Sequence, residues 1–343
     1  MWPGRLSCDT LDHSHPRIAS DHNGGVMLRF GVHSGQQYST FEECLDLWQR
    51  AEQLGFDWVS LFDHYRPPLG GPGGPCFDGP ALLAALAART SRVRCAILVS
   101  AVTWRHPALA ATLAATIDHV SSGRLEFGVG AAGPDLGYEQ YGLPFPDAGT
   151  RLDMLEEYCQ ILRRLWDGER VTFHGEHYRL TGAHLSPRPL QRRLPLVIGG
   201  GGERRTLRIV ARHADVWNTL AGDLESYRRK AGLLASHCAE EGRRPGEIRQ
   251  SITFRAVLAP TPEDAGRRRA ERLALLPPGS PDLAEYLTFG TPEQCVADLL
   301  PYAEAGVRDF LLGCRPPLDW QTIELFATRV VPELRVKAHN RRN

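Results

Sequence analysis

The sequence predicts a closed barrel of eight parallel strands with a helix after each strand. From Val26 onward, short apolar runs that fit buried parallel strands alternate with stretches of helical period. Glycine at Gly55 and proline at Pro107 stand where one helix is expected to end and another to begin. Eight such strand–helix units are typical of the (β/α)8, or TIM, barrel. A doubly wound open sheet is the alternative that the same alternation allows.

The first half of the chain contains four of these units. Leu47, Trp48, Ala51 and Leu54 share one face of the first expected helix, which is why we predict a helix there. Strands are expected at 26–33, 57–62, 93–100 and 125–129. Helices are expected at about 40–54, 80–90, 107–121 and 151–166.

The second half continues the pattern with two interruptions. Residues 170–174 and 177–180 predict a small hairpin outside the barrel, and the proline-rich segment 275–286 is expected to be an insertion. Strands are expected at 195–198, 214–218, 250–258 and 308–313. Helices are expected at 204–213, 224–241, from about 263, at 292–305 and at 320–331.

One catalytic domain is expected to occupy residues 26–334. Residues 1–25 contain acidic residues and proline but no apolar core of a signal peptide, so they predict a disordered or non-native leader. Residues 335–343 are expected to form a C-terminal tail. The eight cysteines have neither zinc-site nor disulfide-framework spacing, and they predict reduced thiols in a cytoplasmic protein.

Charge and hydropathy exclude several kinds of partner. The chain has 40 basic and 40 acidic residues and no basic stripe, so we expect no nucleic acid to bind. No apolar run reaches the length of a membrane span, so we expect no membrane partner. No zinc, P-loop or nucleophile-elbow motif is present, and no metal is expected.

Polar groups follow the predicted strands, where the active site of such a barrel lies. His33, Asp63 with His64, Ser100 and Asp135 come at or soon after four successive strands. His64 could donate a hydrogen bond to a ligand ring or move a proton, although a lone histidine more often bonds a neighbouring carbonyl. Asp63 would orient His64 or cap the following turn.

Four consecutive glycines, Gly199 to Gly202, lie between the fifth strand and its helix. Backbone amides there can approach an anion closely, and the helix N-terminus adds partial positive charge, which suits the phosphate of a cofactor. A flexible strand-to-helix turn is an equally good interpretation. Arg105 and His106 would either contact a phosphate or carboxylate, or cap the helix that Pro107 begins.

Several segments resemble luciferase-like monooxygenases of the bacterial luciferase superfamily, in the same order along the chain. They include Gly55-Phe56-Asp57-Trp58-Val59 with Asp63-His64, Thr103-Trp104-Arg105-His106-Pro107, Gly123-Arg124-Leu125-Glu126-Phe127-Gly128-Val129-Gly130, and the glycine run with Ala214-Asp215-Val216-Trp217-Asn218. Within that family the chain is most similar to the branch that depends on coenzyme F420, a deazaflavin.

The resemblance implies a luciferase-like TIM barrel whose coenzyme lies across the strand ends. His64 would stand beside the ring as the catalytic residue. Gly200, Gly201 and Gly202 would hold the phosphate, and a backbone bulge near Ile97 and Leu98, often with a non-proline cis peptide, would support the ring. The expected coenzyme-binding residues are His33, Asp63, Ile97, Leu98, Ser100, Gly130, Asp135, Gly199, Gly200, Gly201 and Gly202. The family also implies a homodimer.

Two positions differ from the sugar-phosphate dehydrogenases of this family. Those enzymes carry a tryptophan shortly after the Asp-His pair, where this chain has Pro67 and Pro68. They also use a glutamate acid in the loop after the fourth strand, where this chain has Gly133. The resemblance therefore implies no glucose-6-phosphate dehydrogenase activity.

Three functions are compatible with the sequence. The first is a coenzyme F420-dependent oxidoreductase that transfers a hydride between the deazaflavin and a small organic substrate. The second is a monooxygenase of the same fold that uses FMN and dioxygen. The third is a non-catalytic barrel that only binds a ligand, which the presence of Asp63-His64 and the glycine run disfavours.

Overall fold

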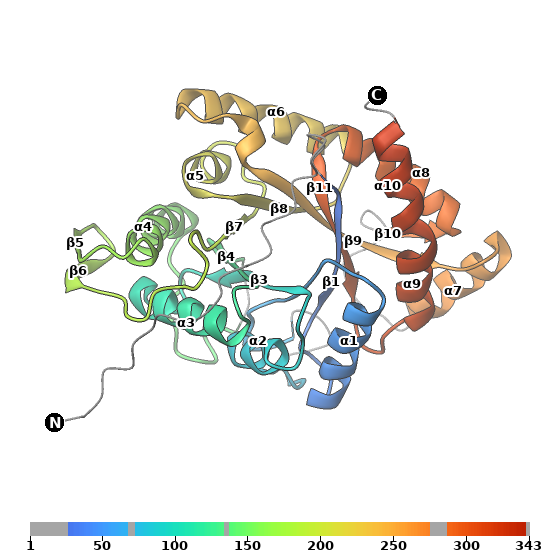
Figure 1. Ribbon diagram of the computed structural model, residues 1–343, viewed down its shortest axis with the longest axis horizontal. Helices are drawn as coiled ribbons and strands as arrows, with labels where there is room; N and C mark the ends of the chain where they lie inside the picture. Colours follow the sequence, from blue (N-terminus) through green and yellow to red (C-terminus); the bar gives the residue numbers. More distant parts are fainter. Residues whose placement is uncertain (1–26, 68–72, 134–136, 275–286, 341–343) are drawn as a thin grey trace, which may run out of the picture.

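The computed structural model describes residues 27–67, 73–133, 137–274 and 287–340. Eight parallel strands form a closed barrel, because β9 pairs with β8 on one side and with β11 on the other (Figure 1). Around the ring these strands are β1 (Arg29–Ser34), β2 (Trp58–Leu61), β3 (Arg94–Ala101), β4 (Leu125–Gly130), β7 (Leu196–Gly199), β8 (Val216–Leu220), β9 (Arg249–Leu258) and β11 (Val307–Cys314). The predicted barrel is confirmed, and the open-sheet alternative is excluded.

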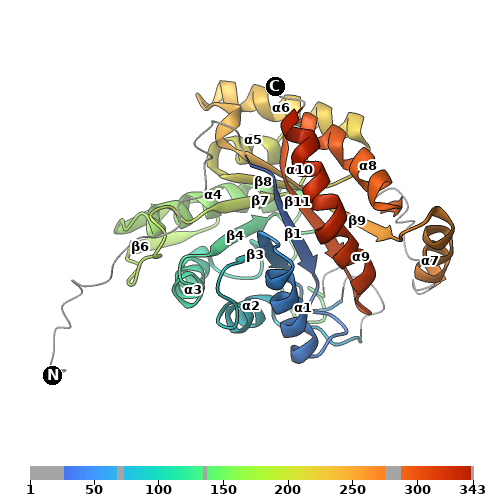
Figure 2. The ribbon, with the colours of Figure 1, turned by 45° about the vertical axis from the view of Figure 1, so that its right-hand side comes forward.

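Helices surround the barrel (Figure 2). They are α1 (Phe41–Gln53), α2 (Gly79–Ala87), α3 (Pro107–Val120), α4 (Ala148–Trp166), α5 (Thr206–His213), α6 (Leu224–Glu240), α7 (Pro262–Ala274), α8 (Pro292–Glu304), α9 (Trp320–Leu325) and α10 (Val331–Asn340), with a 3-10 turn at Pro245–Glu247 and a π turn at Phe326–Val330. Thr40 and Thr291 each form a capping box with the residue three positions on. These reciprocal bonds satisfy backbone donors that a helix start leaves unpaired.

The predicted hairpin is present as β5 (Val171–His174) and β6 (Arg179–Ala183), an antiparallel pair outside the barrel. It lies against α4, and the Glu157 carboxylate there accepts hydrogen bonds from the backbone N–H groups of the connecting turn at 2.7–3.1 Å. The loop between two barrel elements is thereby ordered without adding a strand to the barrel.

Three boundaries differ from the sequence-based expectation. Strand β10 (Leu287–Gly290) was not predicted; it pairs with Arg255–Leu258 at the far end of β9, outside the ring of eight. Helix α4 begins at Ala148 rather than 151, because the Asp147 carboxylate caps it. The final helix continues to Asn340, with Ala338 buried, so residues 335–340 are not a loose tail. The predicted leader and the insertion at 275–286 lie outside the described residues.

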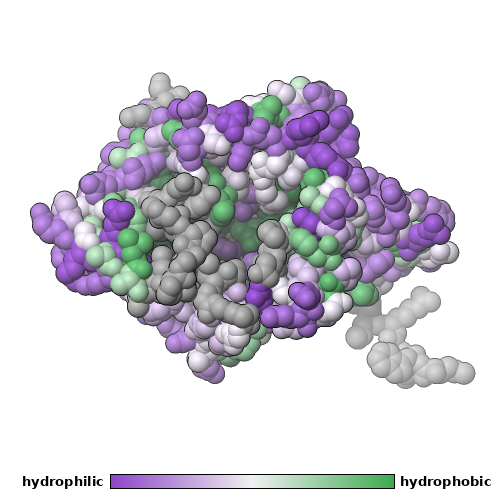
Figure 3. All heavy atoms as spheres, turned by 180° about the vertical axis from the view of Figure 1, so that it is seen from behind, coloured by the Kyte–Doolittle hydropathy of each residue, from purple (hydrophilic) through white to green (hydrophobic). Residues whose placement is uncertain are grey.

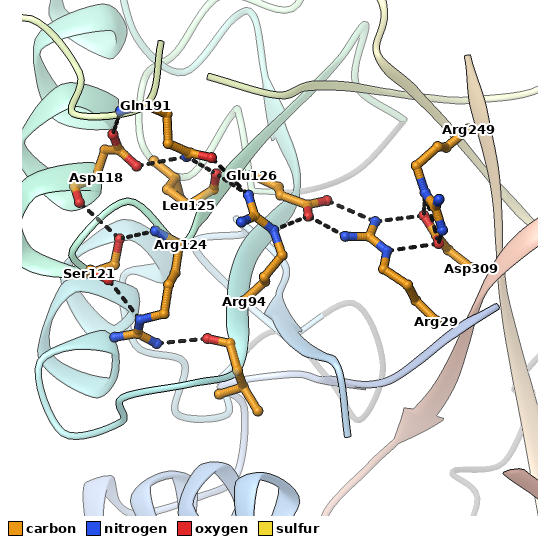
Figure 4. Close-up of polar contacts among 11 residues, drawn as sticks. Arg29, Arg94, Asp118, Ser121, Arg124, Leu125, Glu126, Gln191, Arg249 and Asp309 are labelled. Carbon is orange, nitrogen blue, oxygen red and sulfur yellow. Dashed lines mark hydrogen bonds and ion pairs between the residues drawn. The ribbon is translucent and has the colours of Figure 1, made fainter. Parts of the chain in front are cut away.

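The barrel interior is filled by two kinds of side chain. An apolar layer brings together residues of five strands, namely Trp58, Ala96, Leu98, Val197, Val216 and Leu311. Below it, at the N-terminal ends of the strands, lies a network of buried charges (Figure 4). The guanidinium of Arg29 lies 5.0 Å from the Trp58 ring centre and connects the two layers.

In this charge network each buried carboxylate faces two arginines. Glu126 accepts from Arg29 at 2.6 Å and from Arg94 at 2.5 Å, while Asp309 accepts from Arg29 at 2.7 Å and also pairs with Arg249. Burial alone would raise the pKa of Glu126, but the charges of Arg29 and Arg94 lower this pKa to about 2. The network fills the N-terminal end of the barrel interior with paired charges.

Candidate active site

Two adjoining cavities open at the C-terminal ends of the strands, where one face of the molecule is hollowed near its centre (Figure 3). The larger cavity, about 710 Å³, lies over β3, β4, β7 and β8 and reaches α6. The smaller cavity, about 280 Å³, lies over β1, β2, β9 and β11. Both volumes suit small-molecule sites. Four residues line both cavities: His64, Leu98, Asn218 and Leu220.

His64 stands at the border between the cavities and lines both of them. It follows β2, and its ring lies 4.6 Å from that of Phe62. Its Nδ1 atom is buried and has no hydrogen-bond partner among the described residues, so the interpretation of a histidine bonded to a neighbouring carbonyl is not supported for this atom. Burial lowers the pKa of His64 to about 4, so the ring is neutral near pH 7.

His33 lines the smaller cavity rather than the larger one. Its Nδ1 lies 2.9 Å from the Ser60 hydroxyl oxygen, which holds the ring in place. Burial, followed by the positive charge of Arg255 and by His64, lowers the pKa of His33 to about 4. Two neutral imidazoles therefore face the smaller cavity, and each has one nitrogen able to donate and one able to accept a hydrogen bond.

Asp63 does not orient His64. Its buried carboxylate accepts a hydrogen bond from Ser100 at 2.6 Å and pairs with Arg105. Burial raises the pKa of Asp63, while Arg105 and Ser100 oppose that rise. The Asp63–Ser100 hydrogen bond therefore connects the end of β2 to β3. In addition, the backbone carbonyl of Asp63 accepts a hydrogen bond from the Trp104 indole N–H at 3.0 Å. Arg105 is thereby committed to protein carboxylates and is not available to a phosphate.

The helix-capping interpretation holds for His106. Its Nδ1 accepts a hydrogen bond from the backbone N–H of Ala108 at the start of α3. The sequence left this capping role and anion binding as equal alternatives for Arg105 and His106, and for neither does the structure favour an anion.

Strand β3 carries the expected irregularity. Its register with β4 breaks between Ile97 and Ser100, and the Leu98–Val99 peptide bond is cis. A Cβ atom added at Gly130 or at Gly199 would come within 2.8 or 2.9 Å of the Val99 side chain. These glycines are therefore required by the bulge itself, which brings Leu98 and Val99 to the floor of the larger cavity.

The glycine run forms one wall of the larger cavity. Gly199, Gly200 and Gly201 line it together with Thr206, the first residue of α5, and the N-cap residue Arg205 gives this helix no side-chain hydrogen bond. Lys230 of α6, one of only two lysines in the chain, lines the same wall. A Cβ atom on Gly201 would lie 3.0 Å from its ammonium nitrogen. Amides, a helix N-terminus and a cation thus meet where a phosphate would fit.

The remaining predicted residues divide into three groups. Leu98 and Gly130 line the larger cavity as expected. Ile97 and Ser100 are buried below it, and Gly202 packs against Thr206, where an added Cβ would lie 2.6 Å from the threonine hydroxyl. These three residues do not line the cavity. Asp135 lies outside the described residues.

The lysine and the two arginines that line the cavities were not predicted. Lys230 lies far along the chain from the glycine run, and only its rarity among arginines distinguishes it in the sequence. Arg255 interrupts an apolar strand, and Arg315 directly follows β11. Both arginines line the smaller cavity, and a search for polar residues after every strand, rather than the first five, would have found Arg315.

Among the described residues, no group of three or more His, Cys, Asp or Glu side chains could hold a metal ion. No helix in the same part of the chain is long and apolar enough to cross a bilayer.

The barrel, the bulge in its third strand and the cavity with the glycine wall together define a coenzyme-binding (β/α)8 barrel. The family model of the luciferase-like monooxygenases matches residues 23–279, and the chain belongs to this family. An F420-dependent glucose-6-phosphate dehydrogenase of Microbacterium testaceum is 30% identical over 90% of this chain and 98% of that protein.

Solved structures have the same fold. An F420-dependent secondary alcohol dehydrogenase, solved with an F420–acetone adduct, superposes with a TM-score of 0.77 at 22% identity, over 90% of this chain and 99% of its own. Monooxygenase RslO1 from Streptomyces bottropensis superposes with a TM-score of 0.73 at 26% identity, over 89% and 99%.

Proposed function

We propose that this protein is an oxidoreductase that uses coenzyme F420 and a small organic substrate. The main support is the pair of adjoining cavities that share His64, in a chain 30% identical over nearly the full length of a relative named for F420 dependence. The larger cavity would hold the coenzyme, and the smaller cavity the substrate. The deazaflavin, when bound, supplies a carbon centre that accepts or donates a hydride.

The larger cavity fits the coenzyme on two observations. Gly200, Gly201, Thr206 and Lys230 surround a space suited to the phosphate, and a side chain on Gly201 would crowd the lysine. Leu98 and Val99 form an apolar floor for a flat ring. His64, with its unpartnered Nδ1, would hydrogen-bond a ligand at the border between the cavities and hold or move a proton there.

We do not include glucose 6-phosphate, the substrate in the relatives' name, as the proposed substrate of this protein. By the family resemblance, Pro67 and Pro68, and Gly133, stand where the sugar-phosphate dehydrogenases carry tryptophan and glutamate. Gly133 lines the larger cavity with no side chain to offer, and nothing lies within 4 Å of an added Cβ. We therefore propose a substrate other than glucose 6-phosphate.

The test is an equilibrium titration of the purified protein with coenzyme F420 and, in parallel, with FMN, followed by fluorescence. Saturable binding of F420 alone is the expected result. Binding of FMN alone, with oxygen consumed during turnover, would replace the proposal by the monooxygenase function. Binding of neither compound would contradict both. We also propose that the protein forms a homodimer, as the family resemblance implies. Sedimentation velocity, which measures the molecular mass in solution, tests this.

A further inference from the structure

The smaller cavity has a cationic wall. Arg255 comes from the C-terminal half of β9, and Arg315 from the loop after β11; both line this cavity opposite His33 and His64. A narrow recess of about 50 Å³ continues from it and is lined by the same two arginines and by Arg272 of α7. Three guanidinium groups thus gather at one end of the substrate cavity.

No described carboxylate pairs with Arg255 or Arg315. Within the described part of the chain, the guanidinium groups of Arg255 and Arg315 make no ion pair, and Nη1 of Arg255 is buried without a hydrogen-bond partner. Arg272 donates to the carbonyls of Pro317 and Arg315, both at 3.0 Å, and so positions the loop that carries Arg315. Asp319 lines the recess, but its carboxylate is engaged by Arg268 and by Thr322 at the start of α9.

Three other arginines with little exposed side chain pair with carboxylates. Arg29 and Arg94 are each bonded to a buried carboxylate. Arg163 pairs with Asp215 in the same way.

Arg124, which is also partly buried, has no carboxylate partner but donates to the backbone carbonyls of Val93 and Ala87, both at 2.7 Å. Among the described residues, Arg255 and Arg315 have neither kind of partner. Leaving a buried charge without an opposite charge is costly, so an anionic ligand that reached these guanidinium groups would be stabilised there.

Burial and the closeness of the three arginines lower the pKa values of Arg255 and Arg315. Burial, followed by repulsion from Arg272, lowers the pKa of Arg255 to about 10. Burial, followed by repulsion from Arg255 and Arg272, lowers the pKa of Arg315 to about 9. Both side chains stay protonated at neutral pH, so the wall keeps its positive charge under ordinary conditions.

We propose that Arg255 and Arg315 bind an oxyanion group of the substrate, a carboxylate or a phosphate, and that the substrate is therefore a small organic acid or phosphate ester. A guanidinium matches the geometry of both groups through two parallel hydrogen bonds. The anionic end would lie at the β9–β11 side of the smaller cavity, and the reacting carbon toward His64 and the larger cavity. The identification of this anion site as part of the substrate rests on the proposed function; the binding itself does not.

The test measures thermal unfolding midpoints of the full chain, without coenzyme, at increasing concentrations of inorganic phosphate or acetate. Sodium chloride keeps the ionic strength constant. For the wild type we expect a saturable rise of the midpoint, because a ligand that binds only the folded state stabilises it. A rise with phosphate alone assigns a phosphate ester, and a rise with acetate alone assigns a carboxylic acid. No rise with either anion would overturn the proposal.

Three variants locate the binding. Arg255→Gln and Arg315→Gln should each raise the half-saturating anion concentration at least tenfold. Arg244→Gln is the matched control, since that side chain is 88% exposed and its loss should leave the concentration unchanged. Unchanged half-saturation in the two cavity variants would overturn the proposal. Loss of binding in Lys230→Gln alone would do so too, because the anion would then occupy the glycine wall.

A titration with coenzyme F420 separates this proposal from the proposed function. Arg255→Gln should bind the coenzyme within about twofold of the wild type. A tenfold or greater loss would show that the arginines hold the acidic tail of the coenzyme, which would overturn the substrate assignment. Anion binding at Arg255 and Arg315 in a protein that binds no F420 would contradict the proposed function and leave the oxyanion site standing.

Discussion

Among single residues, His64 combines three properties that suit a role in chemistry. It lines both cavities, burial lowers its pKa to about 4, and its Nδ1 has no hydrogen-bond partner in the part of the chain that the structure describes. A neutral imidazole can donate from one nitrogen while it accepts at the other, whereas an imidazolium can only donate. The position of the ring at the cavity border is what makes these properties useful.

Replacing His64 by glutamine should lower turnover by about 10²-fold, because positioned proton donors and acceptors contribute on this order. Steady-state kinetics with F420 and the substrate check this, and circular dichroism should show an unchanged fold. His174→Gln is the control, since that residue is exposed on the hairpin strand β5. Wild-type turnover in His64→Gln would remove this residue from the chemistry.

Replacing Gly201 by aspartate should weaken F420 binding at least tenfold. An added Cβ would lie 3.0 Å from the Lys230 nitrogen, and the new carboxylate would compete with the phosphate for that cation. Fluorescence titration measures the dissociation constant. Gly232→Asp on α6 is the control, because that position is exposed and has open space around it. Equal affinity in both variants would place the phosphate elsewhere.

Among the elements, the N-terminal ends of the barrel strands carry the buried ion pairs, and the C-terminal ends carry the cavities. Arg29 and Arg94 begin β1 and β3 and join the buried carboxylates Glu126 and Asp309. The opposite ends of the strands carry the bulge and the cavities. A bulge in β3 needs small neighbours, which Gly128 and Gly130 of β4 supply. The sequence Gly128-Val129-Gly130 in β4 is thus explained by the bulge in β3, which leaves no space for a side chain at either glycine.

Replacing Glu126 by glutamine should lower the free energy of unfolding by about 3–5 kcal/mol, because removing one partner leaves buried charge uncompensated. Urea denaturation measures the change. Glu169→Gln is the control: that residue forms an exposed ion pair with Arg164 on the surface, and such pairs contribute about 0–1 kcal/mol. Equal effects in the two variants would contradict the importance of the buried network.

Across the molecule as a whole, folding and proton binding are coupled. The pKa values of His33 and His64 are both about 4 in the folded state, below the value of about 6.5 for an unfolded histidine. Between these values the unfolded chain binds more protons, so these two groups make stability fall as pH falls from 6.5 to 4. Above pH 6.5 their contribution is complete and constant.

The double variant His33→Gln with His64→Gln should therefore lose less stability than the wild type between pH 6.5 and pH 4. Each histidine contributes a slope of at most about 1.4 kcal/mol per pH unit in this window. Urea denaturation at pH 7, 5.5 and 4.5 measures the difference, which also cancels the effects of other titrating groups. Parallel pH dependence in the two proteins would show that the histidines are not buried neutral.

The local pattern of the sequence was sufficient for the fold. Apolar runs, helical periodicity and helix-boundary residues such as Gly55 and Pro107 act over a few positions, so they predicted the eight barrel strands and most helix boundaries. Segments whose order depends on a distant partner were missed. Strand β10 exists because the end of β9 offers it a pairing edge, and the last helix extends because Ala338 has a core to pack against.

For the site, the sequence was enough to predict the family and the end of the barrel at which the cavities open, with His64 and part of the glycine run in their lining. Which polar residues are available to a ligand emerged only from their arrangement in space. Asp63 and Arg105 neutralise each other, whereas Arg255 and Arg315, 60 positions apart, meet in one cavity without a carboxylate partner among the described residues. The physical reason is that charge compensation depends on distance in space, which no local pattern records.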